Sequence, residues 1–135
     1  MKHTLRPLLN GSKFNIYALA LDGTCKMEEF LADVEHLDKR EWTSLMAFLE
    51  RCAEHGPPQN KEKSRPLGDD LFEFKSKGTR ICYFYDKGQM IVCTHGFHKP
   101  QGKVQNAEIK AAKKVLKNYL VERKKGPILI EDAKE

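Results

Sequence analysis

Long apolar segments are absent from the sequence. The longest unbroken apolar run covers only residues 16–21, whereas a helix that spans a membrane needs about 20 such residues. The positively charged N-terminus contains only Leu8 and Leu9 where a secretory signal has an apolar core of about 7 to 15 residues. We therefore expect a cytoplasmic protein without a membrane span.

Cysteine is scarce, and its spacing matches no metal or redox motif. The four cysteines lie 27, 30 and 11 residues apart, with no CxxC pair, which excludes zinc-ribbon and thioredoxin spacing. The sequence also lacks a phosphate-binding loop, a Gly-x-Ser-x-Gly turn, an HExxH helix and an EF-hand loop. We expect buried thiols, no metal site and no cofactor.

Positive charge is concentrated in the second half of the chain. Residues 1–60 contain 7 Lys and Arg against 9 Asp and Glu, whereas residues 61–125 contain 16 against 7. Clustered cations bind polyanions because they release the counterions condensed on phosphates. The pattern predicts a face that binds nucleic acid, although a solvated basic helix would give the same count.

Apolar periodicity predicts the elements of what is, at 135 residues, a single domain. One helix is predicted over residues 26–37. A second helix follows, with Asp38 as its cap, Glu41 completing a capping box, and Gly56-Pro57 at its end. Strands are predicted over 14–21, 70–75, 79–86 and 90–97, a loop over 59–68, a last helix over 107–123, and a short strand or docking segment over 128–130.

The order of these elements predicts an α+β fold. We expect a small antiparallel sheet with two N-terminal helices packed on one face and a C-terminal helix, which leaves the opposite face free for function. If Lys87-Gly88 forms a two-residue hairpin loop, Arg80 lies opposite His95 and Cys82 opposite Cys93. A different loop length would shift that register.

Cations and histidines are densest on the strands predicted after residue 70 and at the ends of these strands. Cleavage of RNA without a metal needs cations that stabilise the extra negative charge on the phosphorane, together with a proton acceptor and a proton donor. Interleaved aromatic rings can stack on bases, although such rings more often belong to a core. The candidate residues are Lys75, Lys77, Arg80, His95, His98, Lys99 and Lys103.

Several segments resemble, in order and spacing, the HigB-type branch of the RelE/ParE toxin superfamily. They are LGDDLFEFK at residues 67–75, GTRICYFY at 78–85, HGFHK at 95–99, then Lys103 and the basic helix entered at Glu108-Ile109. The resemblance implies a microbial-ribonuclease-like toxin domain at residues 14–125, an N-terminal extension at 1–13 and a C-terminal tail at 126–135. It further implies a toxin of a type II toxin–antitoxin pair, typically an mRNA endoribonuclease that cuts translated message on the ribosome.

The resemblance also implies roles for particular residues. In similar toxins, basic side chains take the place of a metal while the 2′-hydroxyl attacks the adjacent phosphate, and Arg80 and Lys99 are the leading candidates for this role. The residues that match such positions are Lys75, Arg80, Lys99 and Lys103. RNA contacts are expected from Lys77, Tyr83, Phe97 and Lys110.

The identity of the proton acceptor stays open. It is His95, His98 or a lysine with a lowered pKa. Similar toxins have a second consecutive lysine where this chain has Pro100, and proline fixes φ and removes a donor. We therefore expect the phosphate-binding loop to differ from that of the family.

A toxin of this kind implies partners. We expect a cognate antitoxin, typically a helix-turn-helix DNA-binding protein, that neutralises the basic face, and the ribosome with its mRNA as the target, without a membrane. Two alternatives stay open. One is a non-catalytic module of the same fold, either a ParE-like gyrase poison or a protein that only binds its antitoxin or nucleic acid, and the other is an unrelated basic RNA-binding domain.

Overall fold

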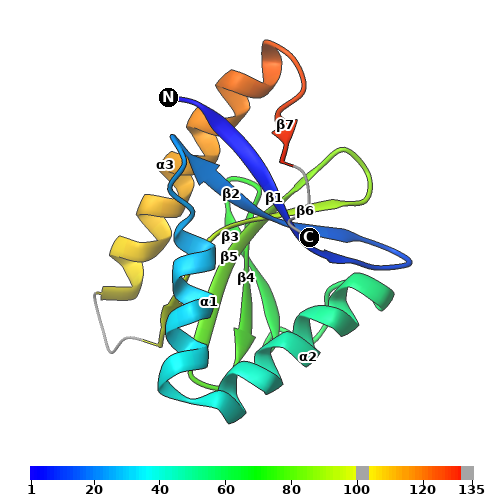
Figure 1. Ribbon diagram of the computed structural model, residues 1–135, viewed down its shortest axis with the longest axis vertical. Coiled ribbons are helices and arrows are strands. Elements are labelled where there is room, and N and C mark those ends of the chain that lie inside the picture. Colours follow the sequence, from blue (N-terminus) through cyan, green and yellow to red (C-terminus); the bar gives the residue numbers. More distant parts are fainter. Residues whose placement is uncertain (100–103, 132–135) are drawn as a thin grey trace.

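The computed structural model of the chain describes residues 1–99 and 104–131 (Figure 1). These residues form seven strands and three helices. In chain order they are β1 (His3–Asn10), β2 (Asn15–Leu21), α1 (Lys26–Leu37), α2 (Lys39–His55), β3 (Ser64–Gly68), β4 (Leu71–Ser76), β5 (Thr79–Asp86), β6 (Met90–His98), α3 (Val104–Lys124) and β7 (Leu129–Ile130). None of the described helices has the length and hydropathy required to cross a membrane.

The strands form one mixed sheet in the order β3-β4-β5-β6-β2-β1-β7. β2 pairs with β6 and β1 pairs with β7 in parallel, and all other neighbours are antiparallel. The expectation of a small antiparallel sheet with two N-terminal helices packed on one face is therefore wrong, because the sheet is larger, mixed and rich in strands. Parallel pairing joins strands that are distant in the sequence, so no local pattern predicts it.

Two strands lie in segments for which the sequence predicts none. β1 contains Pro7, which cannot donate a hydrogen bond to the ladder, and the register shifts between Pro7 and Leu9. β3 is an edge strand, paired only with β4, in the polar segment expected to be a loop. Proline at a bulge and the partial exposure of an edge strand both weaken the apolar alternation by which strands are predicted. β7, in contrast, resolves the choice left open for residues 128–130 in favour of a strand.

The buried residues form two clusters on opposite faces of the sheet. Tyr83 packs in the cluster that includes α1 and α2, and the next residue of β5, Phe84, packs in the cluster that includes α3. Adjacent residues of a strand point to opposite faces. The ring of Tyr119 on α3 lies 4.8 Å from that of Phe84, so α3 covers the face that we expected to be free.

The β5–β6 register differs from the predicted one. Asp86 pairs with Met90, so the loop has three residues, and a bulge follows between Cys82 and Tyr83. Arg80 therefore pairs with Phe97 rather than with His95, and Cys82 rather than Arg80 lies opposite His95. Because side chains alternate along a strand, Arg80, Cys82, Phe97 and His95 still point to the same face.

The start of α2 follows the sequence signal in part. The Asp38 carboxylate accepts hydrogen bonds from the amides of Arg40 and Glu41, each at 3.1 Å, which confirms the predicted cap. The reciprocal half of the capping box is not formed. Glu41 Oε1 is buried without a hydrogen-bond partner among the described residues, and the Asp38 amide donates instead to the carbonyl of Val34.

Replacement of the cap tests this assignment. Asp38→Ala removes the acceptor for both amides and should lower the free energy of unfolding by about 1 kcal/mol. Asp38→Asn keeps a side-chain oxygen at the same position and should stay close to wild type. Urea denaturation measures both variants, and an equal loss in both would contradict the capping role.

A second prediction concerns the contact between β6 and α1. A Cβ built on Gly96 would lie 2.2 Å from Cδ2 of Phe30, a member of the first core cluster. Gly96→Ala should therefore lower the free energy of unfolding by about 1 to 3 kcal/mol, the usual effect of overpacking. In a double-mutant cycle, Phe30→Leu should offset part of the loss, and strictly additive effects would contradict the proposed steric conflict.

Candidate functional site

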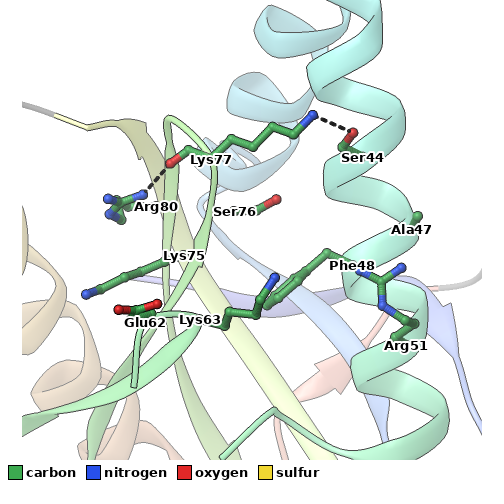
Figure 2. A pocket seen from close by; sticks show the side chains of 10 residues that line it. All are labelled: Ser44, Ala47, Phe48, Arg51, Glu62, Lys63, Lys75, Ser76, Lys77 and Arg80. Atoms are coloured by element: carbon green, nitrogen blue, oxygen red, sulfur yellow. Dashed lines mark hydrogen bonds between the residues drawn. The ribbon is translucent and has the colours of Figure 1, made fainter. Parts of the chain in front are cut away.

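A cavity of about 500 Å³ lies between α2 and the edge of the sheet at β4. Five of its ten lining residues are Lys or Arg, and Glu62 is the acidic one among those described. We call this cavity the basic pocket. Figure 2 shows that α2 supplies one wall, and that β4, β5 and the segment before β3 supply the other. The lining residues are Ser44, Ala47, Phe48, Arg51, Glu62, Lys63, Lys75, Ser76, Lys77 and Arg80.

The basic pocket lies where β4 extends beyond the first residue of β3. β3 begins at Ser64, opposite Phe74, so the end of β4 extends past it. One further backbone hydrogen bond, from the amide of Lys75 to the carbonyl of Lys63 at 2.8 Å, holds the segment before β3 against this end. The two lysines are thereby fixed on neighbouring backbones at the mouth of the pocket.

Arg80 is the most enclosed cation of the basic pocket. The residue is 9% exposed, and its Nη1 donates to the carbonyls of Lys77 and Thr79, each at 2.8 Å (Figure 2). Its guanidinium forms no ion pair with a carboxylate of the described residues. A guanidinium carries five donors, and Nε and Nη2 form no hydrogen bond to the described residues.

The other cations of the pocket also lack carboxylate partners within residues 1–99 and 104–131. Lys77 Nζ donates to the hydroxyl of Ser44 at 3.2 Å. Arg51, Lys63 and Lys75 line the pocket, and their side chains form no hydrogen bond or ion pair in the described part of the chain. Figure 2 shows the Lys63 and Lys77 side chains turned toward α2 and those of Lys75 and Arg80 turned away from it, so the cations lie on both sides of the end of β4. Cations gathered at one edge produce a positive potential that attracts a phosphate group.

His95 lies in a different cavity from Arg80. It lines a space of about 460 Å³ together with residues of β2 and α3. Its Nε2 lies 2.9 Å from a carboxylate oxygen of Glu108 on α3, and its Nδ1 lies 3.1 Å from the hydroxyl of Thr94. Burial lowers the pKa of His95 and outweighs Glu108, which raises it. Both ring nitrogens of His95 are thus in contact with neighbouring side chains.

The residues at the end of β6 lie on two sides of the fold. Nε2 of His98 lies 3.5 Å from Oδ2 of Asp33 on α1, and the His98 ring lies 5.3 Å from that of Phe30. The Lys99 amide donates to the Gly78 carbonyl at 2.7 Å, which brings the backbone of Lys99 beside the β4–β5 turn. Lys103, like Pro100, lies outside the described residues.

The residues expected to contact RNA are not gathered in one place. Tyr83 is 1% exposed, its ring stacks on Phe74 at 3.8 Å, and its hydroxyl is hydrogen-bonded to that of Ser64. Phe97 is buried in the second core cluster. Lys110 is exposed on α3, and Lys77 lines the basic pocket. Lys75, Lys77 and Arg80 are thus the candidates that the fold brings together.

Three charged residues of the basic pocket were missed by the sequence analysis. Glu62 and Lys63 lie in a segment expected to be a loop, and Arg51 lies on a helix in which only the apolar stripe was interpreted. Nothing in the sequence distinguishes Arg51 from the other exposed charges of α2. Its position depends on how α2 packs beside β4. Among the described residues, no group of three or more His, Cys, Asp and Glu side chains is arranged to hold a metal ion.

The environment of His95 predicts a pH dependence of stability. Because its pKa is lowered in the folded protein, the unfolded chain binds more protons. The free energy of unfolding should fall as the pH drops below about 6.5, the ordinary pKa of histidine, and this contribution should level off below the folded-state pKa. His95→Gln keeps an amide near Glu108 and should lack this contribution. Chemical denaturation between pH 7.5 and 5 compares the two proteins, and parallel pH profiles would contradict the assignment.

Comparison with known proteins identifies the family. The profile of a family described as phage-derived protein Gp49-like (DUF891) matches residues 32–117, more than half of the chain, and this region contains every residue of the basic pocket. No curated protein matches the sequence. The Gp49-like family is a RelE/ParE-like toxin family of toxin–antitoxin systems, which implies a cognate antitoxin. The resemblance to that superfamily is thus confirmed, and the chain belongs to the Gp49-like family of toxins.

Proposed function

We propose that this toxin is a ribosome-dependent mRNA endoribonuclease of the HigB type, and that the basic pocket binds the scissile phosphate. Membership of a toxin family supports the first part. The second part rests on Arg80, whose guanidinium is held by two main-chain carbonyls in a pocket with four other cations and offers its remaining donors to a ligand.

The chemistry follows from the groups that line the pocket. The 2′-oxygen attacks the adjacent phosphorus, the bond from phosphorus to the 5′-oxygen breaks, and the products are a 2′,3′-cyclic phosphate and a 5′-hydroxyl. The pentacoordinate intermediate carries more negative charge than the phosphodiester. Arg80, which two main-chain carbonyls hold in position, stabilises this added charge together with Lys75 and Lys63.

Proton transfer is assigned to residues of the same pocket. Glu62 is its acidic lining residue among those described, and it accepts the proton of the 2′-hydroxyl. The Lys75 ammonium donates a proton to the departing 5′-oxygen. His95 is held by Glu108 and Thr94 in another cavity, and His98 is paired with Asp33, so neither is placed in this role.

Partner binding is part of the same proposal. The basic pocket is open to solvent on the side of the segment before β3, where Lys63 and Glu62 are exposed. An antitoxin of the helix-turn-helix type would inhibit the toxin by placing acidic side chains over these cations. The phosphates of mRNA in the ribosomal decoding site would occupy the same positions.

Substitutions in the basic pocket test the proposed function. Arg80→Gln should lower cleavage of translated mRNA at least about 100-fold, the usual effect of removing one donor to a developing oxyanion, and should relieve growth arrest. The matched control is Lys39→Gln, which removes one positive charge from an exposed position outside the pocket. Induction from a repressed promoter, with mapping of new 5′ ends, measures both effects.

Two outcomes would contradict the proposal. Equal cleavage by wild type and Arg80→Gln would remove the pocket from the mechanism. Growth arrest without new 5′ ends would favour a non-catalytic toxin of the same fold, such as a gyrase poison. Glu62→Gln separates the two parts of the mechanism, because it should reduce cleavage while RNA binding is retained.

A further inference from the structure

A second cavity adjoins the basic pocket at the C-terminal end of α2. Its volume is about 400 Å³, and it shares the side chains of Phe48, Arg51 and Lys63 with the basic pocket. The shared residues make the two cavities neighbouring compartments of one groove. We call the second compartment the α2-end cavity, and the further residues that distinguish it are His55, Pro57 and Pro58.

The chemistry of the α2-end cavity differs from that of the basic pocket. The basic pocket is ringed by cations, whereas here the two prolines and Phe48 provide apolar surface and the polar groups are confined to Arg51, Lys63 and His55. Small-ligand sites typically combine an apolar lining with a few polar groups that fix orientation. A flat ring with polar atoms along one edge fits such a cavity.

The backbone around the α2-end cavity is held in place. The carbonyl of Ala53, near the end of α2, accepts hydrogen bonds from the amides of Lys13 and Phe14, at 3.0 and 2.9 Å. Gly56 ends the helix with a φ of 89°, and its amide donates to the carbonyl of Cys52 at 2.8 Å. The backbone at the end of α2 is therefore anchored to the loop between β1 and β2.

We propose that the α2-end cavity binds a guanine base of the RNA whose phosphate occupies the basic pocket, an inference that rests on the proposed function. The base and the phosphate of one nucleotide are joined through the ribose, and the two compartments lie next to each other. The Arg51 and Lys63 side chains offer only hydrogen-bond donors. The Hoogsteen edge of guanine presents two acceptors, O6 and N7, whereas that of adenine pairs an acceptor with a donor.

Nucleotide binding to the purified full-length chain tests this proposal. Guanosine 3′- or 5′-monophosphate should bind at least about tenfold more tightly than the adenosine counterpart and than inorganic phosphate, measured by titration calorimetry. His55→Ala removes the imidazole that lines the α2-end cavity but not the basic pocket, and should weaken nucleotide binding about fivefold or more, with phosphate affinity unchanged. Glu50→Ala, an exposed position on α2 that lines neither cavity, should behave as wild type.

The outcomes separate this inference from the proposed function. If phosphate and all nucleotides bind equally, the guanine site is overturned and the phosphate site stands. If neither phosphate nor nucleotide binds at millimolar concentration, the phosphate site fails and the guanine site fails with it.

Cleavage mapping in cells distinguishes an RNA base from a free nucleotide. Guanine should be enriched at a nucleotide next to the cut for wild type, and the enrichment should fall in His55→Ala while cuts are still made. Tight binding of guanosine monophosphate without any such enrichment would overturn the assignment to RNA and indicate a free guanine nucleotide as the ligand.

Discussion

The parallel pairing of β2 with β6 is the constraint on which the rest of the fold depends. It joins two antiparallel parts of the chain, the β1–β2 hairpin and the β3–β6 meander, into one sheet. Ile16 and Ala18 on β2 pair with Ile91 and Cys93 on β6, and all four are fully buried. Because this pairing sets where the segment between β2 and β3 must run, it also positions α2 beside the free end of β4.

The candidate site is a consequence of that arrangement. β3 pairs with only part of β4, so the remaining edge and the neighbouring face of α2 enclose a cavity instead of a packed core. Its central cation, Arg80, is oriented by main-chain carbonyls and not by a carboxylate. A buried guanidinium held in this way is oriented before a ligand arrives, which is what the proposed binding of a phosphate requires.

Local elements were largely predictable, and their long-range arrangement was not. The periodicity placed α1, α2, β5 and β6 close to their observed bounds, because each has a continuous apolar face. β1 and β3 were missed, since Pro7 interrupts one and exposure at an edge dilutes the pattern of the other. The sequence grouped Lys75, Lys77 and Arg80 with four other candidates, and the structure brings these three together because they are neighbours on one hairpin. Arg51 was missed because it is distant from them along the chain.

By itself, the sequence determined the helices, the central strands, the excess of positive charge after residue 60 and the likeness to RelE/ParE toxins. Each of these features depends only on local spacing and composition. The tertiary structure alone decided the mixed sheet, the β5–β6 register, the coverage of both sheet faces and the separation of His95 from Arg80. These depend on backbone hydrogen bonds and packing between distant segments. Such contacts form only when the whole chain has found one arrangement that buries both faces of the sheet.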